Sequence, residues 1–274
     1  MRNTHNIYLI SDSTGETLDR IFIALRAQFE KFDHNIFHFS FTRTENQILK
    51  ILEDAKKKES IILYTIVDNK LAKFLSQEAN KKNIPCFGVL GDLILNFSKL
   101  LNQKATNIPS GQHILNEEYY KRIEAIQFTM NHDDGNSLSD VEKSDIILLG
   151  VSRTSKTPTS IYLANRGYKT SNIPLVNENS IPENLKSNPK TSCIIGLVAE
   201  ADRLHDVRKN RLTTIKENEN TNYTKLETIQ SEIDKSKKAF KKYQWPIIDV
   251  TRKSVEETAA SVIKIHEIFS NNKK

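Results

Sequence analysis

Cysteine is scarce in this sequence, and long hydrophobic runs are missing. Cys86 and Cys193 are the two cysteines among 274 residues; they have no metal-ligand spacing, and each lies in an apolar run. We therefore expect two buried, reduced thiols of a cytoplasmic protein. No stretch approaches the roughly 18 consecutive apolar residues of a transmembrane helix. The segment MRNTHNIYLISDSTGE has neither the apolar core nor the cleavage site of a signal peptide, so we expect neither feature.

Positive charge is in modest excess, with a net charge of +6. A basic chain can bind nucleic acid, phosphate groups or an acidic partner. The surplus lysines are scattered through polar segments such as 56–58 and 235–242, which is typical of a solvated surface. No recognisable nucleic-acid module is present, and aromatics are not interleaved with the basic residues. We expect a soluble globular protein that binds neither nucleic acid nor a membrane.

The first 95 residues alternate between apolar runs and helical patterns. The expected strands are 7–10, 35–42, 60–68 and 85–91. The expected helices are 16–31, a segment with Ile48, Leu49 and Leu52 on one face, and 69–82. Strands separated by helices of this length predict an N-terminal parallel, doubly wound α/β domain, which we place at residues 1–105.

The pattern changes between about 96 and 143, where loop-like and turn-rich segments flank a helical stretch at 116–131. A second α/β unit follows, with expected strands at 145–149, 191–198 and 245–251 and helices beginning at Pro158, 199, 216 and 253. Proline suits the first turn of a helix because its missing N–H has no intrahelical partner there. We expect residues 106–274 to form a C-terminal phosphate-loop domain, and we find no internal repeat.

The segment IILLGVSRTSKT, residues 146–157, comes close to a phosphate-binding pattern. It matches G-x-x-x-x-G-K-[ST] except that Ser155 replaces the second glycine. In such a loop, backbone N–H groups surround an anion at the positive end of a helix, the lysine reaches phosphoryl oxygens and the hydroxyl can reach Mg²⁺. Serine is acceptable if position 155 keeps a negative φ. Arg153 supports anion binding, since a guanidinium can grip a phosphate with two hydrogen bonds. The alternative is a polar turn with a surface lysine.

A second small-residue turn, SDSTGET at 11–17, follows the first expected strand. Hydroxyl groups and Gly15 at the carboxyl end of a strand form a site that suits an anion. Ser13 and Glu16 equally match a capping box, which would make the segment purely structural. Both interpretations stay open.

HDDG at 132–135 places two carboxylates ahead of the phosphate-loop pattern. Phosphoryl transfer needs a carboxylate near the attacking hydroxyl, and Mg²⁺ prefers hard oxygen ligands. Asp133 and Asp134 are therefore candidates for the base, although Asp-Asp-Gly alone is typical of a turn. His132 is more typical of a solvated or capping residue than of a catalytic base.

Two later segments are weaker signals. DRLHDVRKNRL at 202–212 suits an acidic or phosphorylated ligand through Arg203, Arg208 and Arg211. The alternative is an exposed helix face whose inward residues are Leu204, Val207 and Leu212. WPIIDVTRKSVEETAA at 245–260 predicts a strand and a helix that begins with a capping box of Ser254 and Glu257.

Taken in order, these segments resemble those of the bifunctional pyruvate, phosphate dikinase regulatory proteins. The resemblance is carried by SDSTGET, PSGQH followed by YYKRIEAIQF, HDDG, LLGVSRTSKTPTSIYLANRGYK, DRLHDVRKNRL and WPIIDVTRKSVEETAA. These segments cover nearly the full chain. The branch that acts on phosphoenolpyruvate synthase generally has glycine before the loop lysine. The form SRTSKTP therefore resembles the dikinase branch, in which Ser155 is no departure.

The resemblance implies a regulatory enzyme with two opposed activities. It would inactivate the dikinase by phosphorylating a threonine with ADP as donor, and reactivate it by removing that phosphate with inorganic phosphate, releasing pyrophosphate. Lys156 and Arg153 would offset charge, Asp133 or Asp134 would take the proton, and Thr157 would bind a suspected Mg²⁺. A homodimer is a family-level expectation. The implied ADP site comprises Gly150, Val151, Ser152, Arg153, Thr154, Ser155, Lys156 and Thr157.

Two other classes of function stay open. A non-catalytic nucleotide sensor would bind ADP without transferring phosphate. A plain phosphate-loop NTPase would release inorganic phosphate from ATP without a protein partner.

Overall fold

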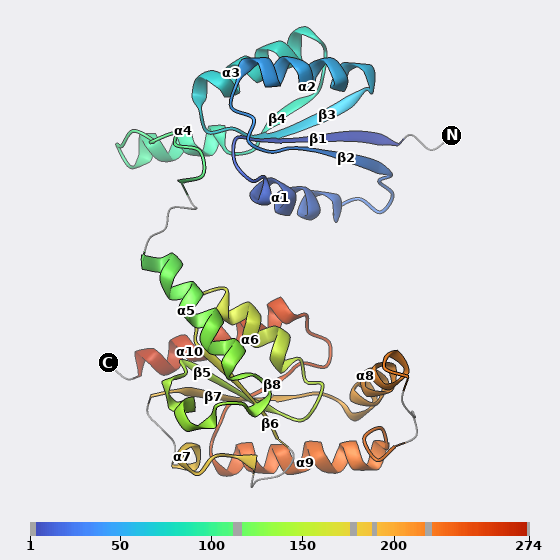
Figure 1. Ribbon diagram of the computed structural model, residues 1–274, viewed down its shortest axis with the longest axis vertical. Coiled ribbons are helices and arrows are strands. Elements are labelled where there is room, and N and C mark those ends of the chain that lie inside the picture. Colours follow the sequence, from blue (N-terminus) through green and yellow to red (C-terminus); the bar gives the residue numbers. More distant parts are fainter. Residues whose placement is uncertain (1–3, 112–116, 176–179, 188–190, 217–220, 273–274) are drawn as a thin grey trace. The chain divides into compact units, whose positions relative to one another are not determined.

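The computed structural model describes residues 4–111, 117–175, 180–187, 191–216 and 221–272. Gln112 and His113 of the PSGQH segment, and residue 116 of an expected helix, lie outside the described residues. The chain forms two compact units, Met1–Ile114 and Leu115–Lys274 (Figure 1). Each unit contains one four-stranded parallel sheet with helices on both faces, which confirms the expected α/β class.

The first unit has the strand order β2-β1-β3-β4. Its strands are β1 (His5–Ser11), β2 (His34–Phe39), β3 (Ser60–Thr65) and β4 (Cys86–Gly88). Its helices are α1 (Glu16–Arg26), α2 (Glu45–Lys57), α3 (Asn69–Lys81) and α4 (Gly91–Leu100). Helices α2 and α3 cover one face of the sheet and α1 covers the other (Figure 1).

Alternating residues of β1 supply the two cores of this unit. Tyr8 and Ile10 pack with Leu52 of α2 and Leu75 of α3 on one face of the sheet. On the other face, Ile7 and Leu9 pack with the buried residues Leu18 and Phe22 of α1. Since successive side chains of a strand point to opposite faces, one apolar run fills both cores.

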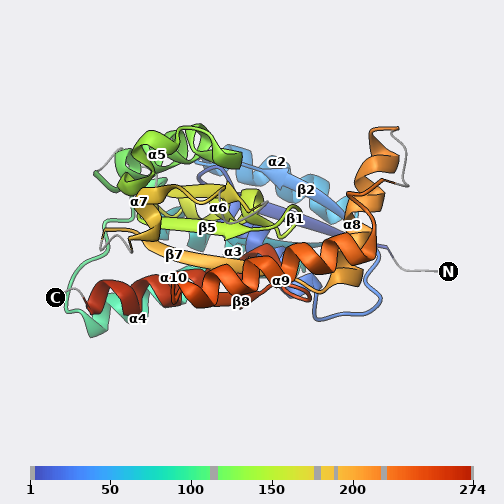
Figure 2. The same cartoon turned by 90° about the horizontal axis from the view of Figure 1, so that it is seen from below.

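The second unit has the strand order β6-β5-β7-β8. Its strands are β5 (Ile146–Gly150), β6 (Thr170–Pro174), β7 (Cys193–Val198) and β8 (Ile247–Asp249). Its α-helices are α5 (Glu117–Asn131), α6 (Lys156–Ala164), α7 (Glu183–Lys186), α8 (Ala201–Thr214), α9 (Leu226–Lys242) and α10 (Val255–Asn271). Figure 1 shows α6 and α10 on one side of the sheet and α7 and α9 on the other, and Figure 2 shows α9 running along the β7 and β8 side.

The two units share one topology, although no repeat is visible in the sequence. In each, the first strand lies second in the sheet, the second strand forms one edge, and the third and fourth follow on the other side. Strands β1 and β5 therefore occupy equivalent places, and so do the loops that follow them. The repetition is in the backbone, because many different apolar residues can fill equivalent positions in such a core.

Several elements differ from the expected ones. Strand β6 was not expected, because Thr170, Ser171 and Asn172 are polar and yet buried. Helix α4 was also missed, and α1 ends at Arg26 rather than near residue 31. The capping box of Ser254 and Glu257 is confirmed.

Neither cysteine forms a disulfide; Cys193 is buried and Cys86 is half-buried. Burial raises the pKa of the Cys86 thiol to about 12, so this thiol stays protonated near neutral pH. Every helix in the described part of the chain is too short or too polar to cross a bilayer.

Substituting Gly196→Ala tests the packing of the second unit. A β-carbon there would lie 2.4 Å from the ring of Phe240, which is fully buried on α9. Overpacking of this kind costs about 1–3 kcal/mol, so the urea midpoint should fall clearly. Gly91→Ala is the matched control, because a β-carbon there meets nothing within 4 Å. Equal midpoints for the two variants would refute the tight contact.

Candidate active site

The loop between β5 and α6 lies at the carboxyl edge of the second sheet. Strand β5 lies between β6 and β7. The connection from β5 therefore leads to the strand on one side of it, and the next connection leads to the strand on its other side. Open parallel sheets bind ligands at this reversal of strand order, beyond the carboxyl ends of the strands. The start of α6 adds the positive end of a helix dipole. The fold therefore puts residues 151–156 where an anion is favoured.

Two non-glycine residues of this loop have left-handed backbone conformations. The φ angle is 71° at Arg153 and 58° at Ser155, the residue that precedes α6. Serine was acceptable at position 155 on the condition that φ stays negative, and this condition is not met: Ser155 has the left-handed geometry that a glycine would adopt without strain. Each such residue costs about 1–3 kcal/mol of conformational free energy, and it persists only where the surrounding structure holds it.

Hydrogen bonds from three elements hold the strained loop. Thr154 Oγ1 donates to the carbonyl of Val151 at 3.0 Å, and Lys156 Nζ donates to the same carbonyl at 3.0 Å. Arg208 of α8 donates to the carbonyl of Ser152 at 3.3 Å. The carbonyls of Val151 and Ser152 are thereby bound by side chains.

Glycine is required at position 150 because there is no room for a β-carbon, and not because of its backbone φ angle. A β-carbon there would lie 2.6 Å from Thr154 Oγ1 and 2.7 Å from the carbonyl oxygen of Leu197 on β7. The loop closes tightly onto the end of β5 and the neighbouring strand, and any side chain at position 150 would open it.

Lys156 is an almost fully buried cation, with 6% of its surface exposed. Burial lowers the pKa of its amine to about 8, and the nearby carboxylates of Asp134 and Asp133 oppose that shift. The amine is thus held at the cleft with little solvent around it, in a place where a bound phosphate would favour its charged form.

Asp133 belongs to a small hydrogen-bonded group with Thr157 and Asn172. Thr157 Oγ1 donates to Asp133 Oδ1 at 3.0 Å, and the Asn172 side-chain amide donates to both Asp133 Oδ1 and, at 2.9 Å, Thr157 Oγ1. The Asn172 side-chain oxygen is buried without a hydrogen-bond partner among the described residues. Asn172 was missed by sequence reasoning, because its role depends on β6 lying beside β5.

Asp134 differs from its neighbour. It has a left-handed backbone, with φ 54°, within the short 3₁₀ turn Asp133–Gly135. Its carboxylate has no hydrogen-bond partner among the described residues, and it lines the cleft beside Lys156. The two adjacent aspartates therefore have different surroundings.

The cleft between these groups has a volume of about 360 Å³ and brings together all four residues expected to be catalytic. Gly150, Val151 and Thr154 are buried behind its surface. The residues that line the cleft are Asp133, Asp134, Ser152, Arg153, Ser155, Lys156, Thr157, Pro158, Asn172, Pro174 and Val207.

His132 anchors the turn that carries both aspartates. Of the two expected alternatives, the solvated histidine is wrong because the ring is buried, whereas the capping histidine is confirmed: Nδ1 lies 2.8 Å from the carbonyl of Phe128 in the last turn of α5, and Nε2 lies 2.8 Å from Asp140 Oδ1. Its own carbonyl accepts a hydrogen bond from the backbone N–H of Asn172. His132 thus links the turn to β6.

Among the three arginines of α8, Arg208 is the one that reaches the loop. It is fully buried and forms an ion pair with Glu232 of α9 at 2.7 Å. Leu204 and Leu212 are also buried, as expected for the inward face of the helix. The arginine had been grouped with an exposed basic face, but it is directed inward with these leucines.

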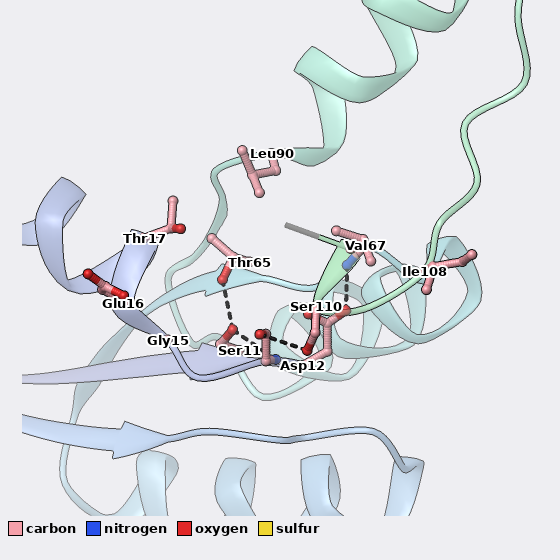
Figure 3. Close-up of a pocket in the computed structure, with 12 residues that line it drawn as sticks. Ser11, Asp12, Gly15, Glu16, Thr17, Thr65, Val67, Leu90, Ile108 and Ser110 are labelled. Atoms are coloured by element: carbon pink, nitrogen blue, oxygen red, sulfur yellow. Dashed lines mark hydrogen bonds between the residues drawn. The ribbon is translucent and has the colours of Figure 1, made fainter. Parts of the chain in front are cut away.

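The SDSTGET turn forms a smaller cavity of about 180 Å³ in the first unit (Figure 3). The expected capping box there is wrong, because Gly15, with φ 92°, precedes α1 and no side chain caps the helix. Ser13 Oγ instead contacts Ser110 Oγ at 2.9 Å, and the buried Asp12 carboxylate accepts the N–H of Val67 at 2.7 Å. Burial raises the pKa of Asp12.

The two equivalent loops differ in charge. Gly15 corresponds to Ser155, since each has a left-handed backbone and directly precedes a helix. The next residue is Glu16 in the first unit and Lys156 in the second. The first loop itself therefore carries a carboxylate where the second carries a cation, although Arg43 donates to the carbonyl of Asp12 in the first loop at 2.9 Å.

Strand, strained loop, buried lysine and helix together define an α/β protein with a cleft lined by Lys156 and Arg153. Comparison with known families narrows this class: residues 7–263 match the family described as Kinase/pyrophosphorylase, and the chain belongs to it.

Similar proteins come from several bacteria, and each is provisionally named a pyruvate, phosphate dikinase regulatory protein. The chain is 68% identical to one from Pelagibacter ubique over 273 residues, covering 99% of this chain and 100% of that protein. It is 43% identical to one from Sphingopyxis alaskensis, covering 96% and 97% of the two chains. It is 41% identical to one from Bartonella bacilliformis, covering 99% and 97%.

The depressed pKa of Lys156 predicts how anion affinity varies with pH. The pKa of the amine is about 8. The amine is therefore charged below that pH, and it loses its charge as the pH rises through that value. The affinity for ADP, measured by calorimetry, should fall between about pH 7.5 and pH 9.5, where the phosphate groups themselves no longer titrate. Lys156→Arg keeps its charge throughout and should give a flat profile. A flat profile for the unaltered protein would contradict this role of Lys156.

Proposed function

We propose that the chain transfers the terminal phosphoryl group of ADP to a threonine of pyruvate, phosphate dikinase, and removes it again with inorganic phosphate. The observation that carries the proposal is the single cleft in which Lys156, Arg153 and Asp134 meet the β5–α6 loop. Membership of the Kinase/pyrophosphorylase family and the names of the similar proteins support both the chemistry and the partner.

Asp134 is the better candidate for the base. The carboxylate of Asp133 already accepts hydrogen bonds from Thr157 and Asn172, which fix it in place. Asp134 lines the same cleft without such bonds and is the carboxylate that acts most strongly on Lys156. A base must be able to reach the hydroxyl proton, so the less constrained carboxylate fits this task.

The forward step forms one bond and breaks one. The threonine oxygen bonds to the β-phosphorus of ADP, the bond from that phosphorus to the bridging oxygen breaks, AMP leaves, and Asp134 takes the hydroxyl proton. Lys156 and Arg153 offset the charge that accumulates on the equatorial oxygens. Positioning by the preformed loop supplies a large part of the catalysis in such reactions.

The reverse activity uses the same groups. Inorganic phosphate bonds to the phosphorus of the phosphothreonine, pyrophosphate leaves, and the freed threonine oxygen regains a proton from Asp134. Both steps place phosphorus between two oxygens in one cation-lined cleft, so one site serves both directions. The loss of only one activity in Lys156 variants would count against a single site.

A Mg²⁺ ion fits the residues that face the cleft. Thr157 Oγ1 and Asp133 Oδ1 lie 3.0 Å apart and are the hard oxygen donors that Mg²⁺ prefers. The described residues contain no group of three carboxylates, histidines or cysteines suited to a metal. Thr157, supported by Asp133, would therefore hold the ion together with phosphate oxygens and water, and the bound ion would neutralise phosphate charge.

The transfer itself is tested by incubating the protein with ADP and the dikinase in its phosphohistidine form. Mass spectrometry should find a phosphate on a dikinase threonine, and AMP should appear in equal amount. ADP binding without transfer would indicate a nucleotide sensor, and phosphate release from ATP without the partner would indicate an NTPase. Lys156→Ala should reduce transfer by about 100-fold or more, since it removes the main cation at the transferred group.

The base assignment is tested by two matched variants. Asp134→Asn should lower kcat about 100- to 10,000-fold, the usual contribution of a positioned base, with little change in ADP affinity. Asp133→Asn should instead weaken the Mg²⁺ dependence, because its partners are Thr157 and Asn172. If Asp133→Asn shows the larger loss of kcat at saturating Mg²⁺, the assignment to Asp134 is wrong.

A further inference from the structure

Arg208 joins four segments of the second unit at the back of the phosphate-binding loop. Its guanidinium donates to the carbonyl of Ser152 at 3.3 Å, to the carbonyl of Tyr223 at 3.0 Å and to the carboxylate of Glu232 at 2.7 Å. The guanidinium carbon also lies 4.6 Å from the centre of the Tyr223 ring. A fully buried arginine with these partners fixes the main chain and the ring of Tyr223 relative to the loop.

Tyr223 in turn contacts the exposed side of the same loop. Its hydroxyl oxygen lies 3.0 Å from Ser152 Oγ and accepts a hydrogen bond from Arg153 Nε at 3.3 Å. A tyrosine hydroxyl can accept one hydrogen bond and donate another, so both contacts can form at once. Tyr223 is 70 residues from Arg153 in the sequence, and no motif marks it.

The contact at Nε determines which nitrogens of the Arg153 guanidinium stay available to a ligand. With Nε bound to Tyr223, the two terminal nitrogens remain, and they have no hydrogen-bond partner among the described residues. Arg153 lines the cleft together with Lys156. Two parallel N–H donors are the arrangement that binds two oxygens of one phosphate.

We propose that Tyr223 is a positioning residue that orients Arg153 toward the bound phosphate, with Arg208 holding the tyrosine ring in place. This inference rests on the proposed function for the identity of the ligand. Arg153 is otherwise a long, exposed side chain on a strained backbone, with many rotamers to lose when it binds. The hydroxyl of Tyr223 removes much of that freedom before the ligand arrives, which favours binding.

Tyr223→Phe tests this role, because it keeps the ring on Arg208 and the main-chain carbonyl and removes only the hydroxyl. Affinity for ADP, and separately for inorganic phosphate, should fall about 5- to 10-fold by calorimetry, which matches the typical net contribution of one hydrogen bond. The thermal midpoint should stay unchanged. Tyr162→Phe is the matched control: it removes a hydroxyl that accepts from Arg166 at 2.6 Å on α6, and should leave affinity unchanged.

The double variant separates positioning from a structural role. In an Arg153→Ala background, Tyr223→Phe should change affinity less than about 2-fold, because the group on which it acts is gone. If the full loss persists in that background, or if Tyr223→Phe binds both anions as the unaltered protein does, the inference is overturned.

The same measurements distinguish this inference from the proposed function. If the unaltered protein binds ADP but never phosphorylates the dikinase, the proposed function fails, while the effect of Tyr223→Phe on binding still decides the positioning role. If the unaltered protein binds neither anion, both are overturned.

Discussion

The left-handed turn at Arg153 and Ser155 is the constraint around which the second unit is organised. Two non-glycine residues with φ of 71° and 58° in one short loop are unfavourable by themselves. They persist because Thr154, Lys156 and Arg208 bind the loop carbonyls and because Gly150 lets the loop close onto β7. The strain is therefore held by groups drawn from the loop itself, from α8 and from the sheet.

The repeated topology gives two loops in equivalent places whose side chains differ. Each loop follows the strand that lies second in its sheet, β1 or β5. Each loop ends in a left-handed residue directly before a helix. In the first unit that residue is Gly15, the loop carries Asp12 and Glu16, and the Arg43 guanidinium donates to the carbonyl of Asp12. In the second unit the corresponding loop carries Arg153 and Lys156. The two loops thus share a backbone geometry and differ in the charge of their own side chains.

Local patterns in the sequence were enough to predict some of this site and not the rest. The apolar strands, the turn between β5 and α6, and the position of Lys156 and Thr157 at the start of α6 follow from neighbouring residues. Strand β6 escaped detection because its buried residues Ser171 and Asn172 are polar. Asn172 could be placed beside Asp133 only once the sheet was known. The sign of φ at Ser155 could not be predicted for a related reason: the turn that it must make is set by contacts of the folded loop.

The use of serine rather than glycine at position 155 is consistent with a loop held from outside. A glycine would adopt φ of 58° without strain, but it would also make the loop more flexible in the absence of ligand. A site that stabilises developing charge gains from groups that do not have to reorganise during the reaction. Three features here limit such reorganisation: the stiffness of a non-glycine loop, the burial of the Lys156 amine and the contacts of the loop to Arg208. The free energy stored in the strained backbone is offset by the folded unit, so it does not have to come from ligand binding.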